Sequence, residues 1–172
     1  DRNAPIIDVK AVYHRNDPIL VGSPSYRPPD QNSRFEAIYR SALHKREMEA
    51  AGVPGIKAVW RHEAGKRYFV VVSIEQLYPG HSRQAGHAAL SCRSGAYAGR
   101  YISVVDDDID VSDMDDVIWA LCTRSDPETS IDIVKRAWST RLDPRISPED
   151  IDKGKFFNSR AMIDATRPYE WK

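Results

Sequence analysis

The stretch Tyr101–Pro127, YISVVDDDIDVSDMDDVIWALCTRSDP, decides the fold class of this chain. A short apolar strand runs into four aspartates within five positions, and an amphipathic segment follows and ends at Arg124 before an Asp–Pro pair. Apolar residues recur at helical spacing over Met114–Arg124, which predicts a helix capped by Ser112 or Asp113. The stretch is therefore a strand-to-helix unit with an acidic turn.

A second strand-to-helix unit precedes this one. The β-branched run Tyr68–Ile74 is broken by Pro79–Gly80, and Ala and Leu then recur at helical spacing over His81–Cys92. The polar, glycine-containing segment after Ile56–Trp60 predicts a β-hairpin between that strand and Tyr68–Ile74. Two such units and a hairpin predict a layered α/β domain with a mixed, partly parallel sheet, in which the strand Tyr68–Ile74 is central because Phe69–Val72 is continuously apolar.

The remaining elements are predicted from weaker patterns. Pro5–His14 alternates apolar and polar residues and predicts a half-buried strand, and a short strand is expected at Ile19–Val21. Gly22–Arg34 has loop composition. Phe35–Ala51 predicts a helix, and Ile131–Val134 predicts a last short strand. The predicted apolar stripe of the helix consists of Phe35, Ile38, Tyr39, Ala42, Leu43 and Met48.

The chain is expected to divide into an α/β domain over residues 1–137 and a tail over residues 138–172. After Trp138 the sequence is poorly periodic and rich in proline and charge, with helix content expected only around Pro148–Lys153. The segment Gly95–Gly99 is predicted to be a turn. Because Asp1 is not an initiator methionine, we expect the chain to begin within a longer protein.

Composition excludes several classes of protein. The 25 basic residues balance 25 acidic ones, so no global field favours nucleic acid or an anionic membrane. No apolar run approaches 18 residues, so no membrane span is expected. Cys92 and Cys122 both lie on apolar helical patterns, which predicts reduced, buried thiols and a cytoplasmic location.

The acidic turn Asp106–Asp110 has three readings from its residues alone. It could hold a hard cation such as Mg²⁺, it could contain a phosphoacceptor aspartate, or it could be a solvated approach to the following helix. An EF-hand loop is excluded, because no glycine occupies its sixth position and no glutamate its twelfth. The five histidines show no zinc-ligand spacing.

The turn between the second strand and its helix is the other candidate site. His81 follows Pro79–Gly80 at a helix start, so its ring and the helix N–H groups could face a phosphate, with Arg83 beside it. The alternative is a local hydrogen bond. Tyr78 ends the strand where α/β sheets place ligands, and otherwise it is a packing aromatic. No serine or cysteine stands in a nucleophile motif, and glycine patterns for nucleotides are absent.

Five segments in order resemble the UbiD family of carboxy-lyases. They are APIIDVKAVYHRNDPIL, GVPGIKAVW, FVVVSIEQLYPGHSRQA, SVVDDDIDVSDMDDVIWALCTRSDP and AMIDATRP. The resemblance covers nearly the whole chain. In that family a flavin-binding half precedes an α/β half that mediates oligomerisation, and this chain is similar to the second half. In the light of the resemblance, the acidic turn reads as a solvated helix approach.

The resemblance implies reversible, non-oxidative decarboxylation of an aromatic or α,β-unsaturated acid with prenylated FMN. The family's cofactor, its divalent metal (Mn or Mg) and K are bound mainly by the upstream half, which also carries the catalytic Glu–Arg–Glu set. No catalytic, cofactor-binding or metal-ligating residue is therefore assigned to this chain, and the chain alone is expected to be inactive. The expected partners are the upstream flavin-binding half, further copies in a dimer or hexamer, and a small aromatic acid.

The resemblance also implies a set of pocket-lining residues. These are Leu77, Tyr78, Leu121 and Thr123. Near Leu77 the family often has a lysine that meets the cofactor phosphate, but this chain has Glu75 or Gln76 there. The tail is expected to reach over a neighbouring subunit.

Two other functions compete with this reading. The chain could be a separate, non-catalytic assembly subunit of such a complex. It could also be a receiver-like domain that accepts a phosphoryl group at Asp106–Asp108, with Lys135 as the functional lysine.

Overall fold

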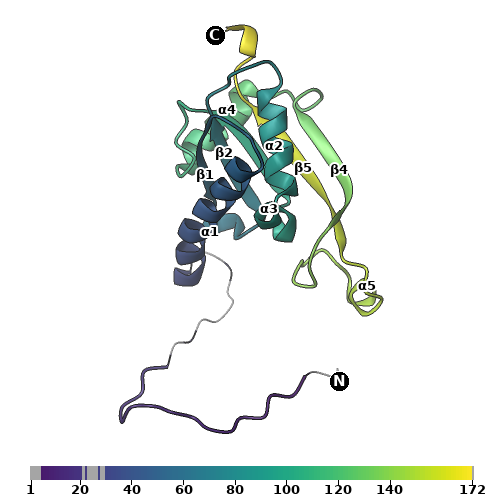
Figure 1. Ribbon diagram of the computed structural model, residues 1–172. Helices are drawn as coiled ribbons and strands as arrows, with labels where there is room; N and C mark the ends of the chain where they lie inside the picture. The colour runs from purple at the N-terminus through teal and green to yellow at the C-terminus, as the bar shows by residue number, and fades with distance from the viewer. Residues whose placement is uncertain (1–4, 21, 23–26, 28–29, 172) are drawn as a thin grey trace.

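The computed structural model describes residues 5–20, 22, 27 and 30–171 (Figure 1). Five strands, five α-helices and two short 3₁₀ helices follow one another in the described part of the chain. They are α1 (Gln31–Ala50), β1 (Ile56–Arg61), η1 (Glu63–Gly65), β2 (Phe69–Ile74), α2 (His81–Ser91), α3 (Arg93–Ala98), β3 (Tyr101–Asp106), α4 (Met114–Arg124), β4 (Ile131–Trp138), α5 (Pro148–Asp152), β5 (Phe157–Ala165) and η2 (Tyr169–Trp171).

The strands form one mixed sheet in the order β1-β2-β3-β5-β4. The three inner strands are parallel, with Val72 opposite Val104 and Val104 opposite Asp164. The two edge strands run antiparallel to their neighbours. The predicted α/β class, the partly parallel sheet and the interior position of β2 are therefore confirmed.

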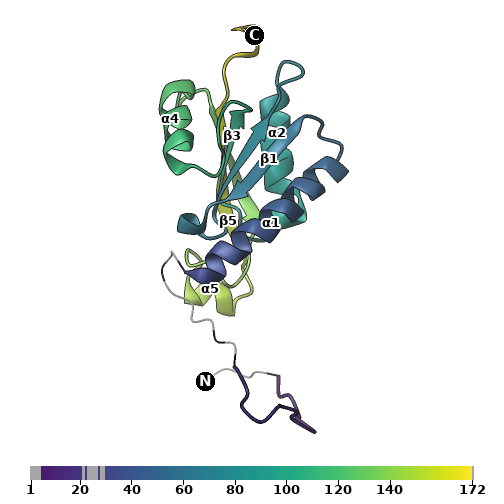
Figure 2. The ribbon, with the colours of Figure 1, turned by 90° about the vertical axis from the view of Figure 1, so that its left-hand side faces the viewer.

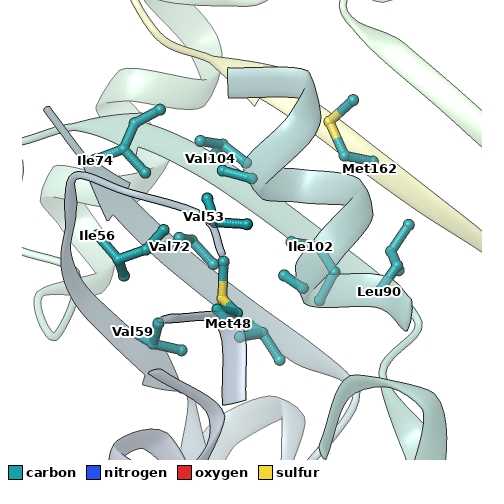
Figure 3. Close-up of a cluster of buried hydrophobic side chains, with 13 residues drawn as sticks. Met48, Val53, Ile56, Val59, Val72, Ile74, Leu90, Ile102, Val104 and Met162 are labelled. Carbon is teal, nitrogen blue, oxygen red and sulfur yellow. The ribbon is translucent and has the colours of Figure 1, made fainter. Parts of the chain in front are cut away.

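Helices cover both faces of the sheet, as Figure 2 shows with α4 on one side and α1 and α2 on the other. On the α1–α2 face, Val72 and Ile74 of β2 pack with Met48 of α1 and Leu90 of α2 (Figure 3). On the α4 face, Val71 lies in a second core cluster. Successive residues of a strand point to opposite faces, so the apolar run Phe69–Val72 of β2 contributes to both cores.

The strongest sequence patterns give the observed elements. The hairpin of β1 and β2 is present, and α4 spans Met114–Arg124 as predicted. Asp113 is the cap of α4, since its side chain accepts the Asp115 N–H at 2.9 Å. On α4, Val117 and Ala120 are buried whereas Ile118 is exposed.

The predicted strand Pro5–His14 is wrong. Residues 5–14 adopt neither helix nor strand, and alternating side chains such as Ile7, which is 84% exposed, face solvent. A strand needs a partner for its backbone N–H and C=O groups, and the described residues of this chain supply none for this segment. Ile19 and Leu20 are likewise exposed and non-regular, and Val21 lies outside the described residues.

Helix α1 begins earlier than predicted and faces the other way. Asp30 caps it by accepting the Ser33 N–H at 2.9 Å, which converts the end of the expected loop Gly22–Arg34 into helix. Within that expected loop, residues 23–26, 28 and 29 lie outside the described residues. Of the predicted apolar stripe, only Met48 is buried. Phe35 is 68% exposed, and the other four residues of the stripe are also exposed: Ile38, Tyr39, Ala42 and Leu43. The face toward the sheet instead holds Ser33, Ala37, Ser41, His44 and Met48.

The region after Trp138 contributes a strand to the sheet. The sequence indicates no strand there, yet β5 lies between β3 and β4, and Met162 is fully buried in the core. The expected division between residues 137 and 138 thus falls inside β4, which pairs with β5. The expected helix around Pro148–Lys153 is present as α5, and the expected turn Gly95–Gly99 lies largely within α3.

Candidate functional site

The acidic turn begins with a buried carboxylate rather than a solvated one. Asp106 is the last residue of β3 and is 0% exposed. Its carboxylate accepts the Gln76 side-chain amide at 2.7 Å and the Arg167 backbone N–H at 2.7 Å. Arg124, at the end of α4, adds an ion pair at 3.2 Å. The reading of Asp106 as part of a solvated helix approach is therefore wrong.

Two arginines share the charge of this turn. Arg124 forms a two-pronged contact with Asp108, with both N···O distances at 2.8 Å. Its guanidinium lowers the pKa of Asp108, and the Asp108 carboxylate in turn raises the pKa of Arg124. Arg167 lies 3.5 Å from both Asp106 and Asp108. Such bidentate arginine–carboxylate pairs fix geometry as well as charge, and they leave Asp106 no room to act as a phosphoacceptor.

The later aspartates of the turn accept hydrogen bonds from nearby backbone N–H groups. Asp110 accepts both the N–H and the hydroxyl of Ser112, and Asp116 accepts the Asp110 N–H at 2.7 Å. Within the described ranges, no three His, Cys, Asp or Glu side chains are grouped so that they could hold a metal ion. Lys135, the lysine that a receiver-like domain would need, lies exposed on β4 beside β5.

His81 supports the turn instead of facing a ligand. Its ring is fully buried. The Leu77 N–H can only donate, so at 3.2 Å it assigns Nδ1 as acceptor, and Nε2–H then donates to the Pro54 carbonyl at 3.0 Å. The ring of Tyr78 lies 4.5 Å from that of His81. The local-hydrogen-bond reading of His81 is the one that the structure supports.

A polar pocket lies at the carboxyl ends of the parallel strands, where open α/β sheets commonly bind ligands. We call it the carboxyl-end pocket; its volume is about 250 Å³. Its walls come from the turn after β2, the start of α2, the end of α4 and the segment after β5. The lining residues that carry charge or a polar side chain near these ends are Gln76, Arg83, Arg124, Asp164, Thr166 and Arg167.

The charges around the carboxyl-end pocket compensate one another. Arg83 pairs with Asp132 at 2.5 Å, and His87 reaches the same carboxylate at 3.0 Å. The Arg83 hydrogen bond lowers the pKa of Asp132. Ser82 donates to Asp164 at 2.6 Å. These walls can orient a polar group by hydrogen bonds.

The four predicted lining residues lie around this pocket, and none of them is among the described residues that line it. Leu77 is half exposed, and its carbonyl accepts the Tyr169 hydroxyl at 3.2 Å. Tyr78 donates to Gln84 at 2.5 Å. Leu121 packs on the core of the α4 face, and the Thr123 hydroxyl donates to the Trp119 carbonyl. Their role in a substrate pocket stays a prediction.

Where the family often has a lysine, this chain has Glu75 and Gln76, which contact other residues of the chain. Glu75 pairs with Lys57 of β1 at 2.5 Å, and Gln76 holds Asp106. No local pattern in the sequence predicts that Arg167 contacts Asp106 and Asp108, since these contacts depend on the position of the chain after β5. Only the order of the AMIDATRP segment among the five quoted pieces pointed to this part of the chain.

The cysteines are both free, and one of them is exposed. Cys122 lies on the outer side of α4, so its predicted burial is wrong. Cys92 is half-buried between α2 and α3, and burial raises its pKa to about 11. A thiol with so high a pKa carries little thiolate at neutral pH and is a poor nucleophile.

Comparison with known proteins gives a family. Residues 35–165 match the UbiD_C family, described as the 3-octaprenyl-4-hydroxybenzoate carboxy-lyase C-terminal domain. The phenolic acid decarboxylase of Bacillus subtilis (strain 168) is 28% identical over 171 residues, which are 97% of this chain and 34% of that protein. The chain thus spans about a third of the length of the curated relatives it matches. In the described residues, no helix is both long enough and apolar enough to span a membrane.

Solved structures agree with this assignment. The UbiD-class enzyme HmfF from Pelotomaculum thermopropionicum, in complex with FMN, superposes with a TM-score of 0.69 at 31% identity, over 80% of this chain and 29% of that one. The 3,4-dihydroxybenzoic acid decarboxylase of Klebsiella pneumoniae superposes with a TM-score of 0.67 at 26% identity, over 80% and 29%. Residues 35–165 include all five strands of the sheet as well as Gln76 and Arg124, which contact Asp106, and the chain therefore belongs to the UbiD_C family of carboxy-lyase C-terminal domains.

Proposed function

We propose that this chain is the C-terminal part of an enzyme that decarboxylates an aromatic or α,β-unsaturated carboxylic acid, reversibly and without oxidation, with prenylated FMN. The match of residues 35–165 to a carboxy-lyase domain carries the proposal. The names of two similar proteins support the same activity. One is a phenolic acid decarboxylase, and HmfF is a UbiD-class enzyme whose structure was solved in complex with FMN. The role of this chain is mainly assembly and pocket lining.

The residues of this chain do not by themselves form a flavin site. The carboxyl-end pocket has a volume of about 250 Å³ and mostly polar walls, whereas cofactor sites are mostly apolar and about 300–1,000 Å³ in volume. Its arginines are already paired with aspartates. We therefore assign the cofactor, its divalent metal (Mn or Mg) and K to an upstream flavin-binding segment, and no chemical step to this chain.

The assembly role is supported by apolar side chains that the described residues leave uncovered. The outer face of α1 presents Phe35, Ile38 and Tyr39, and we call this set the α1 stripe. Trp119 on α4 is exposed as well, with the Arg124 guanidinium 4.9 Å above its ring. Contiguous exposed apolar groups of this kind mark protein interfaces. We assign them to contacts with the upstream segment and with further copies in a dimer or hexamer, and residues 138–172 to contacts with a neighbouring subunit.

Activity tests the catalytic part of the proposal. The chain is co-expressed with its upstream flavin-binding segment and a source of prenylated FMN, and CO₂ release is measured with phenolic, heteroaromatic and cinnamic acids. We expect release from at least one class, and none from this chain without the upstream segment. Absence of both CO₂ release and bound flavin over the whole panel would refute the proposal.

Light scattering tests the assembly part. Ile38→Asp places a charge in the α1 stripe without touching the core, and we expect it to lower the molar mass of the assembly. Asn32→Asp adds the same carboxylate on the same helix outside the α1 stripe and serves as the control. If the two variants have equal molar mass, the α1 stripe is not an assembly surface, whatever the outcome of the activity assay.

A further inference from the structure

A second hollow lies at the opposite end of the sheet from the carboxyl-end pocket. We call it the arginine pocket; its volume is about 420 Å³. Arg61 ends β1 and pairs with Val70 near the start of β2, so this hollow is at the amino end of the parallel strands. Residues of α1, of α3 and of the end of β4 line it, and α1 and α3 contact each other. The side chains that matter to its chemistry are Arg40, Leu43, Arg61, Arg93, Tyr97 and Trp138.

The arginine pocket carries an excess of positive charge. Three arginines line it against a single acid, Glu47, whose carboxylate is already engaged with the Ser94 N–H at 2.7 Å. Glu36 lies near the rim, but it is shared by Arg40 at 3.3 Å and Arg67 at 3.5 Å. Four guanidinium groups therefore face two carboxylates, and both carboxylates have partners.

Arg61 is the most unusual of these groups. It is 3% exposed, and its terminal nitrogens donate to the carbonyls of Ser94 and Arg67, both at 3.0 Å. No carboxylate in the described part of the chain forms an ion pair with it. Burial, with the nearby charges of Arg40 and Arg67, lowers its pKa to about 10. A buried cation without an anionic partner is strongly disfavoured, so the site is short of one negative charge.

Two donors in the wall have no acceptor. The Nε atoms of Arg40 and Arg61 are both buried, and neither has a hydrogen-bond partner among the described residues. Buried polar groups are paired in the great majority of cases. A separate hollow of about 10 Å³ touches the same two arginines, which is room for about one water. A water can accept one of these hydrogen bonds, but it supplies no charge.

The rest of the wall is aromatic and apolar. The rings of Tyr97 and Trp138 lie 6.3 Å apart, tilted by 50°. Trp138 is 57% exposed, and Leu43 adds an aliphatic side chain. The Arg67 guanidinium lies 5.5 Å from the centre of the Tyr97 ring. Aromatic walls beside arginines suit a ligand with a planar apolar body and a charged end.

We propose that the arginine pocket binds a small planar carboxylate. Its carboxylate group accepts hydrogen bonds from Arg40 and Arg61 and supplies the missing charge, and its ring packs against Tyr97 and Trp138. The site is independent of the flavin-dependent activity proposed above, because it uses other residues at the other end of the sheet. Its occupancy is expected to stabilise the contact between α1 and α3.

Binding of benzoate to the purified full-length, flavin-free protein tests the proposal. In a calorimetric titration, we expect Arg40→Met to weaken benzoate binding by roughly 10- to 100-fold, the loss expected for a hydrogen bond to a charged group. Arg46→Met removes the same charge from the exposed side of the same helix and is expected to leave the affinity unchanged. Arg40 is used because Arg61→Met removes a buried group and can unfold the protein.

Ligand chemistry provides the second comparison. Benzamide keeps the ring but lacks the charge, and acetate keeps the charge but lacks the ring, so both are expected to bind at least ten times more weakly than benzoate. Trp138→Ala should weaken benzoate but not acetate. Absence of benzoate binding, or equal binding by the Arg40→Met and Arg46→Met variants, would overturn the proposal. The second result would place benzoate elsewhere in the protein, and neither result bears on decarboxylation.

Discussion

The side chain of Gln76 donates a 2.7 Å hydrogen bond to the buried carboxylate of Asp106. Its amide also donates to the carbonyl of Arg167 at 2.9 Å, and the Arg167 N–H returns a hydrogen bond to Asp106. These three residues follow or end β2, β3 and β5. One closed set of hydrogen bonds therefore ties the carboxyl ends of the three parallel strands, and it builds the floor of the carboxyl-end pocket.

Replacing Gln76 by leucine should destabilise the fold. The change removes a donor from a buried carboxylate, and leaving such a group short of a partner costs about 2–3 kcal/mol. Urea unfolding at neutral pH measures the free energy of unfolding. Gln84→Leu removes an exposed glutamine from α2 and is the control, with an expected loss below about 1 kcal/mol. Equal losses in the two variants would show that Asp106 does not depend on Gln76.

Acid should weaken the fold through His44. Burial, with the charge of Arg61, lowers the pKa of His44 from its ordinary value of 6.5 to about 4. The unfolded chain binds the proton more tightly, so this contribution is fully present above pH 6.5 and is lost as the pH falls toward 4. The shift corresponds to about 3 kcal/mol.

The measurement is the free energy of unfolding by urea between pH 7 and pH 4. His44→Gln keeps a donor for the Ala89 carbonyl, which His44 contacts at 3.0 Å, but cannot titrate. We expect this variant to lose stability less steeply over the same pH range. An unchanged slope would rule out His44 as the source.

Asp143 should govern stability at lower pH. Burial alone would raise its pKa, but the hydrogen bonds from Arg100, the Arg145 N–H, Asn158 and Ser139 lower it from its ordinary value of 3.8 to about 2. Its contribution is therefore present above pH 3.8 and is lost as the pH falls toward 2, a difference of about 2 kcal/mol.

The substitution Asp143→Asn tests this carboxylate directly. It leaves the Arg100 guanidinium, which is ion-paired to Asp143, without its charge partner. We expect a loss of about 3 kcal/mol at neutral pH and a flatter acid limb below pH 4. Asp107→Asn, on the exposed turn, is the control and should change stability by less than about 0.5 kcal/mol. A steep acid limb that survives in Asp143→Asn would contradict the assignment.

Gly55 should tolerate a side chain less well than Gly52. Both have positive φ, +84° at Gly52 and +68° at Gly55, so alanine introduces backbone strain of about 1–2 kcal/mol at either position. A Cβ on Gly52 meets nothing within 4 Å, whereas one on Gly55 would lie 2.7 Å from the Glu75 carbonyl oxygen. Thermal unfolding should therefore show a larger loss for Gly55→Ala. Equal losses would mean that the turn beside His81 relaxes freely.

Part of this molecule follows from local patterns in the sequence. The β1–β2 hairpin, the helices α2 and α4 and the central place of β2 were predicted because periodicity and turn residues act over a few positions. The same rules gave α1 its existence but not its orientation. Most of its apolar stripe faces outward because Met48 and the small residues Ala37 and Ser41 pack on the sheet. The buried face of a helix is determined by the surface against which it packs.

The presence of strand β5 and the burial of Asp106 follow from tertiary contacts and not from local patterns in the sequence. Arg160 and Asn158 interrupt the strand pattern of β5, yet Arg160 is buried because it donates to the carbonyls of Leu90, Gly95 and Ala96 between α2 and α3. In the sequence, Asp106 looks like one of several solvated aspartates. In the folded chain, Gln76, Arg124 and Arg167 donate hydrogen bonds to its buried carboxylate. Local periodicity was enough to predict the regular elements, and the order of the five segments indicated the family. Pairings between residues tens of positions apart determined which polar groups are buried, because a charged side chain enters the interior only where the fold supplies its partners.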